Sequence, residues 1–584
     1  MTDRWINVVL SIVVVLGLIG VALYEQPRRA EERAELLGQE VVEVDDGAPA
    51  SGERRDPLEG LTGSVEDAAE GVAEEGLTQD GVGLGEHGVT ASHPLAVDVG
   101  MGVLAAGGNA VDAAIAVSYA LGVTEPFGSG IGGGGAMLVH EPGTDPISYD
   151  YREVAPQSGE LPSSDIGVPG FVAGMEHIHE RHGSMDLREL IEPAVVLAED
   201  GFEVGEYLNA RLQAAAHRLP INLAPRFFPD GAAIAVGETL VQPEHGEALR
   251  RIKDEGAAAF YEGGLGERIT EEVSGLDMDD FAAYEVLEVE PAIGSFAGLD
   301  IIGGGPPVSG PTLVQFLHIA EALGVADLDP DSAEYHHALA QSYRLAIADR
   351  VEYISDPSQE DVPLGGLLDP TYAEQLAQIV PEDGFVPREQ ADDEAELGPE
   401  SDTTHFVVVD DEGTMVSATN TLGNFFGSGL IVDGYFLNDQ FRNFSRDPES
   451  INAPAPGKRP RSFITPVIVA ADDKPMLGIG SPGGRRIPMI VGQVLIRWAA
   501  HGQDLTTAAE VPRIHLEGRE LFFEADPPGD VADTLAGYGY EIVTEEPVTE
   551  FYGGVQALRV DHDEAVITGF ADERRAGTWA STSQ

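Results

Sequence analysis

The sequence contains no cysteine, which excludes disulfides, thiol nucleophiles and thiolate metal sites but does not indicate a cellular compartment. Lysine is almost as scarce, because only Lys253, Lys458 and Lys474 occur among 584 residues. Acidic residues outnumber basic ones by 101 to 33, and the formal net charge is −68. Such a chain repels phosphate, so we expect no nucleic acid among its partners.

The high negative charge would also suit a disordered chain, but 43% of the residues are hydrophobic, which is enough for a folded core. A folded chain that is rich in acid and poor in lysine is typical of proteins from high-salt organisms. Salt there screens the self-repulsion that would otherwise destabilise the fold. We therefore expect a large globular part and a halophilic source.

Local patterns predict several secondary-structure elements. Apolar spacing favours helices over residues 109–121, from residue 187 onward, and over residues 334–353. Two Val- and Thr-rich runs, 406–409 and 415–419, flank an Asp-Asp-Glu-Gly turn and indicate a β-hairpin. The acidic segment 389–402 just before this hairpin has few apolar residues and is typical of an exposed loop.

The threonine pair Thr403-Thr404 at the start of that hairpin is a candidate for chemistry. A threonine hydroxyl becomes a nucleophile when a base lies beside it, and its own α-amino group can serve if the chain is cut between Asp402 and Thr403. The run 480–484, Gly-Ser-Pro-Gly-Gly, can bring backbone N–H groups close to a developing oxyanion. Taken alone, these residues suit an ordinary strand edge and a tight turn better than a catalytic site.

The surrounding motifs favour the catalytic interpretation of these residues. Together with the threonine pair, they occur in order at 107–114 (Gly-Gly-Asn-Ala-Val-Asp-Ala-Ala), 131–135 (Ile-Gly-Gly-Gly-Gly), 151–156 (Tyr-Arg-Glu-Val-Ala-Pro), 306–310, 437–440, 458–460 and 480–484. From about residue 85 to near the C-terminus, this series resembles the γ-glutamyltransferase family of N-terminal-nucleophile hydrolases. The resemblance implies an α+β fold, a four-layer αββα sandwich, made as a precursor that cuts itself. Residues 86–402 would form the large chain of the catalytic unit and residues 403–584 the small chain.

The resemblance also implies roles for individual residues. Thr403 matches the nucleophile, Thr421 the second threonine that supports it, and Gly483 and Gly484 the oxyanion-hole glycines. Arg152 matches the arginine that grips the substrate's α-carboxylate, a task that suits the two parallel donors of a guanidinium. Gln440 and Ser462 match further positions that contact the substrate.

Three departures from the family pattern concern the substrate. An aspartate that pairs with the substrate's α-ammonium is replaced by Asn443, which removes a charge-assisted contact. The asparagine expected after Thr421-Leu422 is Gly423, although Asn424 follows directly. The second serine of a Ser-Ser pair is Phe463, preceded by Ser462 and an unusual Arg461. Carboxylate binding through Arg152, Ser462 and Arg461 is therefore expected to persist, while ammonium binding is weakened.

The expected function is that of a γ-glutamyltransferase or γ-glutamyl hydrolase. It would act through an acyl-threonine on γ-glutamyl amides of the glutathione or γ-glutamylcysteine type, with water or an amine or peptide as acceptor. Because relatives that prefer glutaryl groups also carry an amide at the position of Asn443, a glutaryl-type amide acylase is the alternative. A binding or scaffold homologue that no longer cuts itself is a third possibility, disfavoured by the intact Thr403, Thr421 and glycine set. The segment 445–457 is shorter than in relatives with a lid, which predicts an open cleft.

We expect no cofactor and no metal. His177, His179 and His182 could suggest a metal site, but residues 177 and 179 point to different faces of a helix. The glycine run at 132–135 is followed by no Gly-Lys-Ser/Thr, so it is not a phosphate loop. No Gly-x-Ser-x-Gly sequence occurs, which excludes the usual serine-hydrolase elbow.

The N-terminal 85 residues differ from the remainder. Residues 1–24 contain an uncharged apolar run long enough to span a bilayer, so we expect a transmembrane anchor, with a cleaved signal as the alternative. Residues 25–85 are rich in Glu, Asp, Gly and Ala and favour a disordered acidic tether. The arginines after the span would keep the catalytic unit in the cytoplasm. Many members of the family it resembles work outside, and we expect an extracytoplasmic enzyme.

Overall fold

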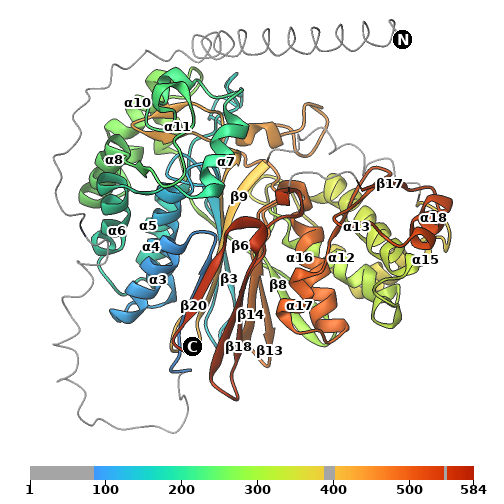
Figure 1. The fold of residues 1–584 in the computed structure, drawn as a ribbon. Coiled ribbons are helices and arrows are strands. Elements are labelled where there is room, and N and C mark those ends of the chain that lie inside the picture. The colour runs from blue at the N-terminus through green and yellow to red at the C-terminus, as the bar shows by residue number, and fades with distance from the viewer. Residues whose placement is uncertain (1–54, 56–83, 387–400, 545–548, 584) are drawn as a thin grey trace, which may run out of the picture.

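The computed structural model describes residue 55 and residues 84–386, 401–544 and 549–583 of the chain. Within these ranges two β-sheets lie at the centre of the molecule, and helices cover their outer sides (Figure 1). The expected anchor at 1–24 lies outside the described residues, as do most of the expected tether and most of the acidic segment before Thr403.

The first sheet has seven strands in the order β20-β1-β9-β10-β2-β3-β6, with all neighbours antiparallel. Its strands are β1 (Gly88–Ala91), β2 (Gly134–His140), β3 (Ile147–Asp150), β6 (Leu287–Val289), β9 (Ser401–Val409), β10 (Met415–Asn424) and β20 (Thr578–Ser581). The central hairpin of β9 and β10 confirms the predicted one. Both strands are longer than the apolar runs indicated, and this added length carries Thr403 and Thr421 into the sheet.

The second sheet has six strands in the order β19-β18-β14-β13-β8-β7, again all antiparallel. These are β7 (Ala292–Phe296), β8 (Leu299–Gly303), β13 (Val467–Ala471), β14 (Lys474–Gly480), β18 (Gln556–Asp561) and β19 (Val566–Ala571). Strand β14 ends at the Gly-Ser-Pro-Gly-Gly run, so this sheet leads directly into the turn that is expected to form the oxyanion hole.

Three buried apolar clusters define four layers. One cluster lies between the sheets and joins Leu138, Val407 and Met415 of the first sheet to Ile302, Ile468 and Leu558 of the second. A second cluster packs the first sheet against α3 (Pro94–Ala105), α4 (Ala110–Thr124), α5 (Phe171–His182), α6 (Leu187–Asp200) and α8 (Pro243–Glu255). A third packs the second sheet against α12 (Gly310–Ala322), α13 (Ala333–Tyr353) and α16 (Ile487–Leu495). The expected αββα sandwich is confirmed, and strands buried on both faces explain their continuous apolar runs.

The predicted helices are confirmed with small changes in their bounds. α4 begins after Asn109, whose side chain accepts a hydrogen bond from the backbone of Asp112 while the Asp112 carboxylate accepts one from the backbone of Asn109. This reciprocal capping box explains why the Gly-Gly-Asn entry starts a helix. α6 begins after Asp186 and α13 after Ser332, both of which cap through a side-chain oxygen.

Shorter elements complete the described structure. They are β4 (Phe202–Glu203), β5 (Thr239–Leu240), α7 (Glu206–Ala215), α9 (Ala258–Tyr261), α10 (Gly264–Glu272), α11 (Met278–Ala282), α14 (Leu364–Leu367), α15 (Pro370–Gln378), β11 (Ile431–Val432), β12 (Tyr435–Phe436), α17 (Leu505–Glu510), β15 (Ile514–Glu517), β16 (Glu520–Phe523), α18 (Gly529–Gly537) and β17 (Glu541–Val543).

The membrane-anchored, extracytoplasmic placement expected from the sequence has to be corrected. Among the described residues, none of the helices combines the length and the apolar composition needed to cross a bilayer. α13 has 21 residues, but charged side chains such as Arg344 and Asp349 interrupt it. The structure therefore gives no support to membrane anchoring.

The three histidines of α5 each have a separate partner. His179 contacts the backbone oxygen of Met185 at 2.7 Å, and His182 contacts the hydroxyl of Tyr149 at 2.7 Å. His177 lies 3.4 Å from a carboxylate oxygen of Glu288. Their ring nitrogens do not converge, and the described part of the chain holds no cluster of three or more candidate metal ligands.

Candidate active site

Thr403 and Thr421 lie directly opposite each other in the central hairpin. Antiparallel pairing of β9 with β10 places Thr421 across from Thr403, and the register shifts immediately afterwards, so that Gly423 pairs with Asp402 and Leu422 is the extra residue of a β-bulge. The Thr421 hydroxyl accepts a hydrogen bond of 2.9 Å from the backbone N–H of Gly423. β9 extends across the expected cleavage point between Asp402 and Thr403.

Most of the expected site residues line one cavity. Its wall includes Thr403, Thr421, Gln440, Asn443, Ser462 and Gly484, together with Gly423, Asn424, Asp439, Arg442, Phe463, Ile464, Arg485, Arg486 and Ile487. We call Thr403, Thr421 and the turn at residues 483–486 the catalytic wall. Residues 437–443 and 462–464 form the recognition wall. No residue of the short segment 445–457 lines the cavity.

The glycine turn of the catalytic wall has a backbone that only glycine adopts easily. Gly483 has a φ of 137° and Gly484 a φ of 57°, both in the left-handed range that a β-carbon disfavours. The turn leads from β14 through a short 3₁₀ segment, Gly484–Arg486, into α16. Gly484 lines the cavity but Gly483 does not. A turn ahead of a helix presents backbone N–H groups, which is the geometry that anion stabilisation requires.

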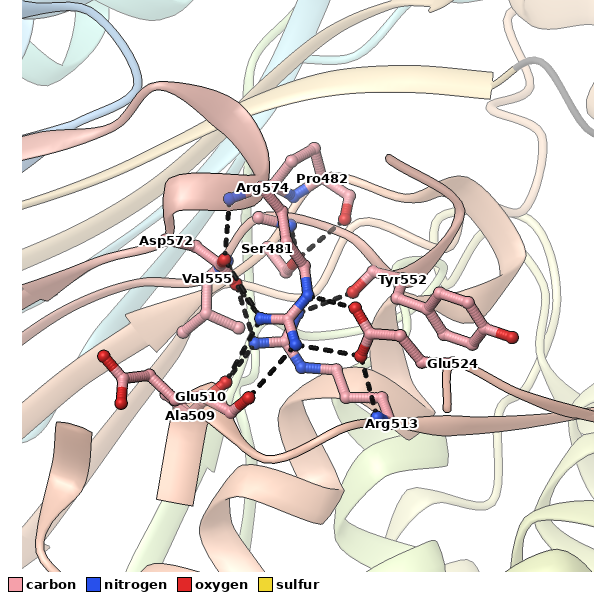
Figure 2. A network of polar contacts seen from close by, with 11 residues as sticks. Ser481, Pro482, Ala509, Glu510, Arg513, Glu524, Tyr552, Val555, Asp572 and Arg574 are labelled. Carbon is pink, nitrogen blue, oxygen red and sulfur yellow. Dashed lines mark hydrogen bonds and ion pairs between the residues drawn. The ribbon is translucent and has the colours of Figure 1, made fainter. Parts of the chain in front are cut away.

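A buried ion-pair network lies beside Ser481 and Pro482, which lead into this turn (Figure 2). Arg513 and Asp572 pair at 2.7 Å, each with 2% of its side chain exposed, and Asp572 also accepts from the backbone of Val555 at 3.1 Å. Next to Val555, the backbone of Gly554 donates to the Ser481 hydroxyl at 3.1 Å. Burial alone would raise the pKa of Asp572, but Arg513 and Arg574 hold it below its ordinary value. The network thus fixes the chain beside Ser481, two residues before the first glycine of the turn.

The recognition wall contains Gln440, Asn443 and Ser462, the positions that the resemblance assigns to the substrate pocket. The Asn443 side chain donates to the side-chain oxygen of Gln440 at 2.8 Å, so the two amides are held together. Phe463, the departure beside Ser462, lies under the guanidinium of Arg350 at 4.1 Å from ring centroid to carbon. This cation–π contact gives the phenyl ring a place that a serine could not fill.

Arg152 and Arg461 do not line the cavity. Arg152 is 1% exposed and binds both carboxylate oxygens of Asp150, at 3.1 and 2.7 Å, and the backbone oxygen of Pro460 at 2.7 Å. Arg461 donates to the backbone oxygens of Arg350 and Val351 at the end of α13. In this structure both arginines hold the chain that leads to Ser462, and a direct grip on a carboxylate stays a prediction for them.

His405, two residues after Thr403, does not compete with the Thr403 α-amino group as a base for the Thr403 hydroxyl. It is fully buried, and burial lowers the pKa of its imidazole to about 3, so that it stays neutral. Its Nδ1 lies 2.8 Å from the Thr419 hydroxyl, and a β-carbon on Gly480 would collide with its ring. His405 therefore packs between the sheets and does not line the cavity.

Sequence reasoning missed Asp439, Arg442, Arg485 and Arg486 as residues of the cavity wall. Two arginines directly after the glycine turn were a visible signal, because the turn itself was predicted to face the reaction. Arg486 is 4% exposed and lies over the ring of Phe551 at 4.3 Å, and burial lowers its pKa to about 10. The position of Asp439 depends on the bulge in β10, which no pattern in the sequence indicated.

Comparisons with known proteins show the family of this chain. The model of a family described as gamma-glutamyltranspeptidase matches residues 96–582. The chain is 40% identical over 497 residues to the capsule biosynthesis protein CapD proenzyme of Bacillus anthracis, covering 85% of this chain and 91% of that one. It is 34% identical over 540 residues to the glutathione hydrolase proenzyme of Bacillus subtilis (strain 168), covering 85% and 92%. Among solved structures, a cephalosporin acylase from Bacillus halodurans superposes with a TM-score of 0.75 at 26% identity, covering 87% and 98%.

Proposed function

The chain belongs to the gamma-glutamyltranspeptidase family, and from this premise we propose that it transfers γ-glutamyl groups through an acyl intermediate on Thr403. The observation that carries the proposal is the single cavity whose wall holds Thr403, Thr421 and Gly484. As an enzyme of this family it acts on γ-glutamyl amides, and the recognition wall is suited to contact the glutamyl portion through Gln440, Asn443 and Ser462.

We propose that maturation comes first. In the uncut chain the nitrogen of Thr403 is part of a peptide bond and cannot act as a base. Cleavage between Asp402 and Thr403 frees an α-amino group beside the hydroxyl of the same residue. The bulge at Leu422 lies opposite this peptide bond and interrupts the ladder there. Residues 86–402 and 403–584 then form the large and small chains of one enzyme.

The chemical cycle has two steps. The Thr403 hydroxyl attacks the γ-carbonyl carbon, and its proton passes to the Thr403 amine. Backbone N–H groups at Gly483 and Gly484 stabilise the oxyanion, and the Thr421 hydroxyl supports the nucleophile. The C–N bond breaks as the leaving amine takes up the proton, which leaves an ester on Thr403. Water or an acceptor amine then attacks the ester and restores the hydroxyl.

A glutaryl-type acylase is the second candidate. It is favoured by one observation, namely that the residue at position 443 in the recognition wall is an uncharged asparagine. A glutaryl group has no α-ammonium and would need no partner of negative charge. Assaying the purified, matured protein on γ-glutamyl and glutaryl anilides side by side separates the two candidates. Strong preference for the γ-glutamyl anilide supports the first, and hydrolysis of the glutaryl anilide alone would refute it.

A further inference from the structure

Asp439 lies in the recognition wall, and two groups of Asn424, just after the bulge, fix its carboxylate. Its Oδ1 accepts from the backbone N–H of Asn424 at 2.9 Å, and its Oδ2 accepts from the Asn424 side-chain amide at 2.6 Å. Its own backbone N–H donates to the carbonyl of Leu422, the bulged residue, at 2.9 Å. Asp439 is 5% exposed and lines the same cavity as Thr403.

Gly423 makes room for this carboxylate. Its φ is +98°, and a β-carbon built on it would lie 2.2 Å from Oδ1 of Asp439. Any side chain at position 423 would therefore displace the carboxylate. The asparagine that the family pattern places at 423 would collide with the carboxylate of Asp439 in its present position, so the glycine at 423 gives this carboxylate its place.

The carboxylate retains capacity for another donor. Each carboxylate oxygen can accept about two hydrogen bonds, and each oxygen of Asp439 accepts one from Asn424. Arg442 lies 3.5 Å from Oδ2, and 48% of its side chain is exposed, so solvent screens its side of this ion pair. Asn443, in contrast, carries no charge and is bound to Gln440.

We propose that Asp439 binds the α-ammonium of the γ-glutamyl donor and so takes over the task that Asn443 cannot perform. This inference rests on the proposed function, because it concerns the donor of that reaction. Asp439 is a specificity residue and takes no part in bond making. The other buried carboxylate near the recognition wall, Glu153, does not line the cavity.

The test compares two anilides that differ only in the α-ammonium. Asp439→Asn removes the charge but keeps the shape, and an amide flip of Asn424 can preserve both hydrogen bonds. We expect the ratio of kcat/KM for γ-glutamyl over glutaryl anilide to fall about tenfold to a hundredfold, the usual range for a charge-assisted hydrogen bond. Glu449→Gln removes the same charge from an exposed position outside the cavity and should leave the ratio unchanged.

The alternative is a purely structural role, in which Asp439 holds the bulge in place and does not contact the substrate. In that case Asp439→Asn would slow both anilides equally, and an unchanged ratio would overturn the inference while leaving the proposed function intact. Wild-type protein that cleaves neither anilide would refute the proposed function itself. Should Asp439→Asn fail to mature, Gly423→Ala provides the second variant, since its methyl group displaces the carboxylate without removing the charge. A ratio equal to wild type in matured Gly423→Ala would overturn the inference as well.

Discussion

The buried pair of Arg513 and Asp572 supports the chain that leads into the catalytic wall, whereas the carboxyl of Glu153 has no hydrogen-bond partner on another described residue. The charge of Glu153 interacts with that of Asp439 in the recognition wall. The first pair fixes a backbone turn whose glycines occupy left-handed conformations. The second wall is built from side chains, and two departures from the family pattern, Asn443 and Phe463, lie in it, while the third, Gly423, lines the same cavity. In this chain the backbone turn expected to take part in chemistry has buried support, whereas side chains expected to contact the substrate differ from the family pattern.

Removing the nucleophile should have the largest effect. Thr403→Ala eliminates the hydroxyl that serves both self-cleavage and acyl transfer, so we expect one uncut chain on a denaturing gel and no activity. Thr403→Ser, which keeps a hydroxyl, is the matched control and should still mature. Two chains from Thr403→Ala would mean that another residue cuts the precursor.

Breaking the support of the catalytic wall should cost stability as well as rate. Asp572→Asn leaves the buried guanidinium of Arg513 without its full counter-charge, and such losses are typically about 3–5 kcal/mol. Because the pair is buried, the loss should persist in molar KCl. Glu244→Gln breaks the exposed pair with Arg226 and should cost less than about 1 kcal/mol. Equal effects of the two variants on urea unfolding would contradict the role assigned to burial.

The pH dependence of the free energy of unfolding tests the buried carboxyl of Glu153. Burial raises the pKa of Glu153 to about 8 from an ordinary 4.5, so the folded protein binds more protons than the unfolded chain between these values. Its contribution to stability is therefore fully present below pH 4.5 and is lost as the pH rises to 8. Glu153→Gln should be more stable than wild type at pH 9, by roughly 2–4 kcal/mol.

Exposed Glu160 supplies the control, since Glu160→Gln should leave the pH profile of unfolding unchanged. A Glu153→Gln protein whose stability fell with pH as steeply as that of wild type would show that another group causes the slope.

The smallest change is expected from Asn443→Asp in the wild-type background. If Asp439 already meets the α-ammonium, a second carboxylate should alter the γ-glutamyl to glutaryl ratio by less than about threefold, well below the effect of a new charge-assisted bond. In the Asp439→Asn background the same substitution should restore much of the lost preference. A large gain in both backgrounds would indicate that Asp439 and Asn443 act independently.

The resemblance of the ordered motifs allowed the four layers to be predicted, while local patterns indicated only single elements. The Val-rich runs of β9 and β10 indicated the central hairpin, and Pro-Gly-Gly indicated a turn. The surroundings of Arg152 could not be predicted, since its guanidinium also binds the backbone oxygen of Pro460, which lies 308 residues further along the chain. Asp439 was missed for a similar reason, because its position depends on one extra residue in β10, which shifts the register and leaves space beside Gly423.

The most direct test of the central claim is to locate the acyl group. Matured enzyme mixed with a γ-glutamyl anilide and quenched in acid should yield a small chain that begins Thr-Thr-His-Phe and carries one γ-glutamyl group on Thr403, as peptide mass spectrometry can show. A small chain that began elsewhere, or a γ-glutamyl group on any other residue, would contradict the account.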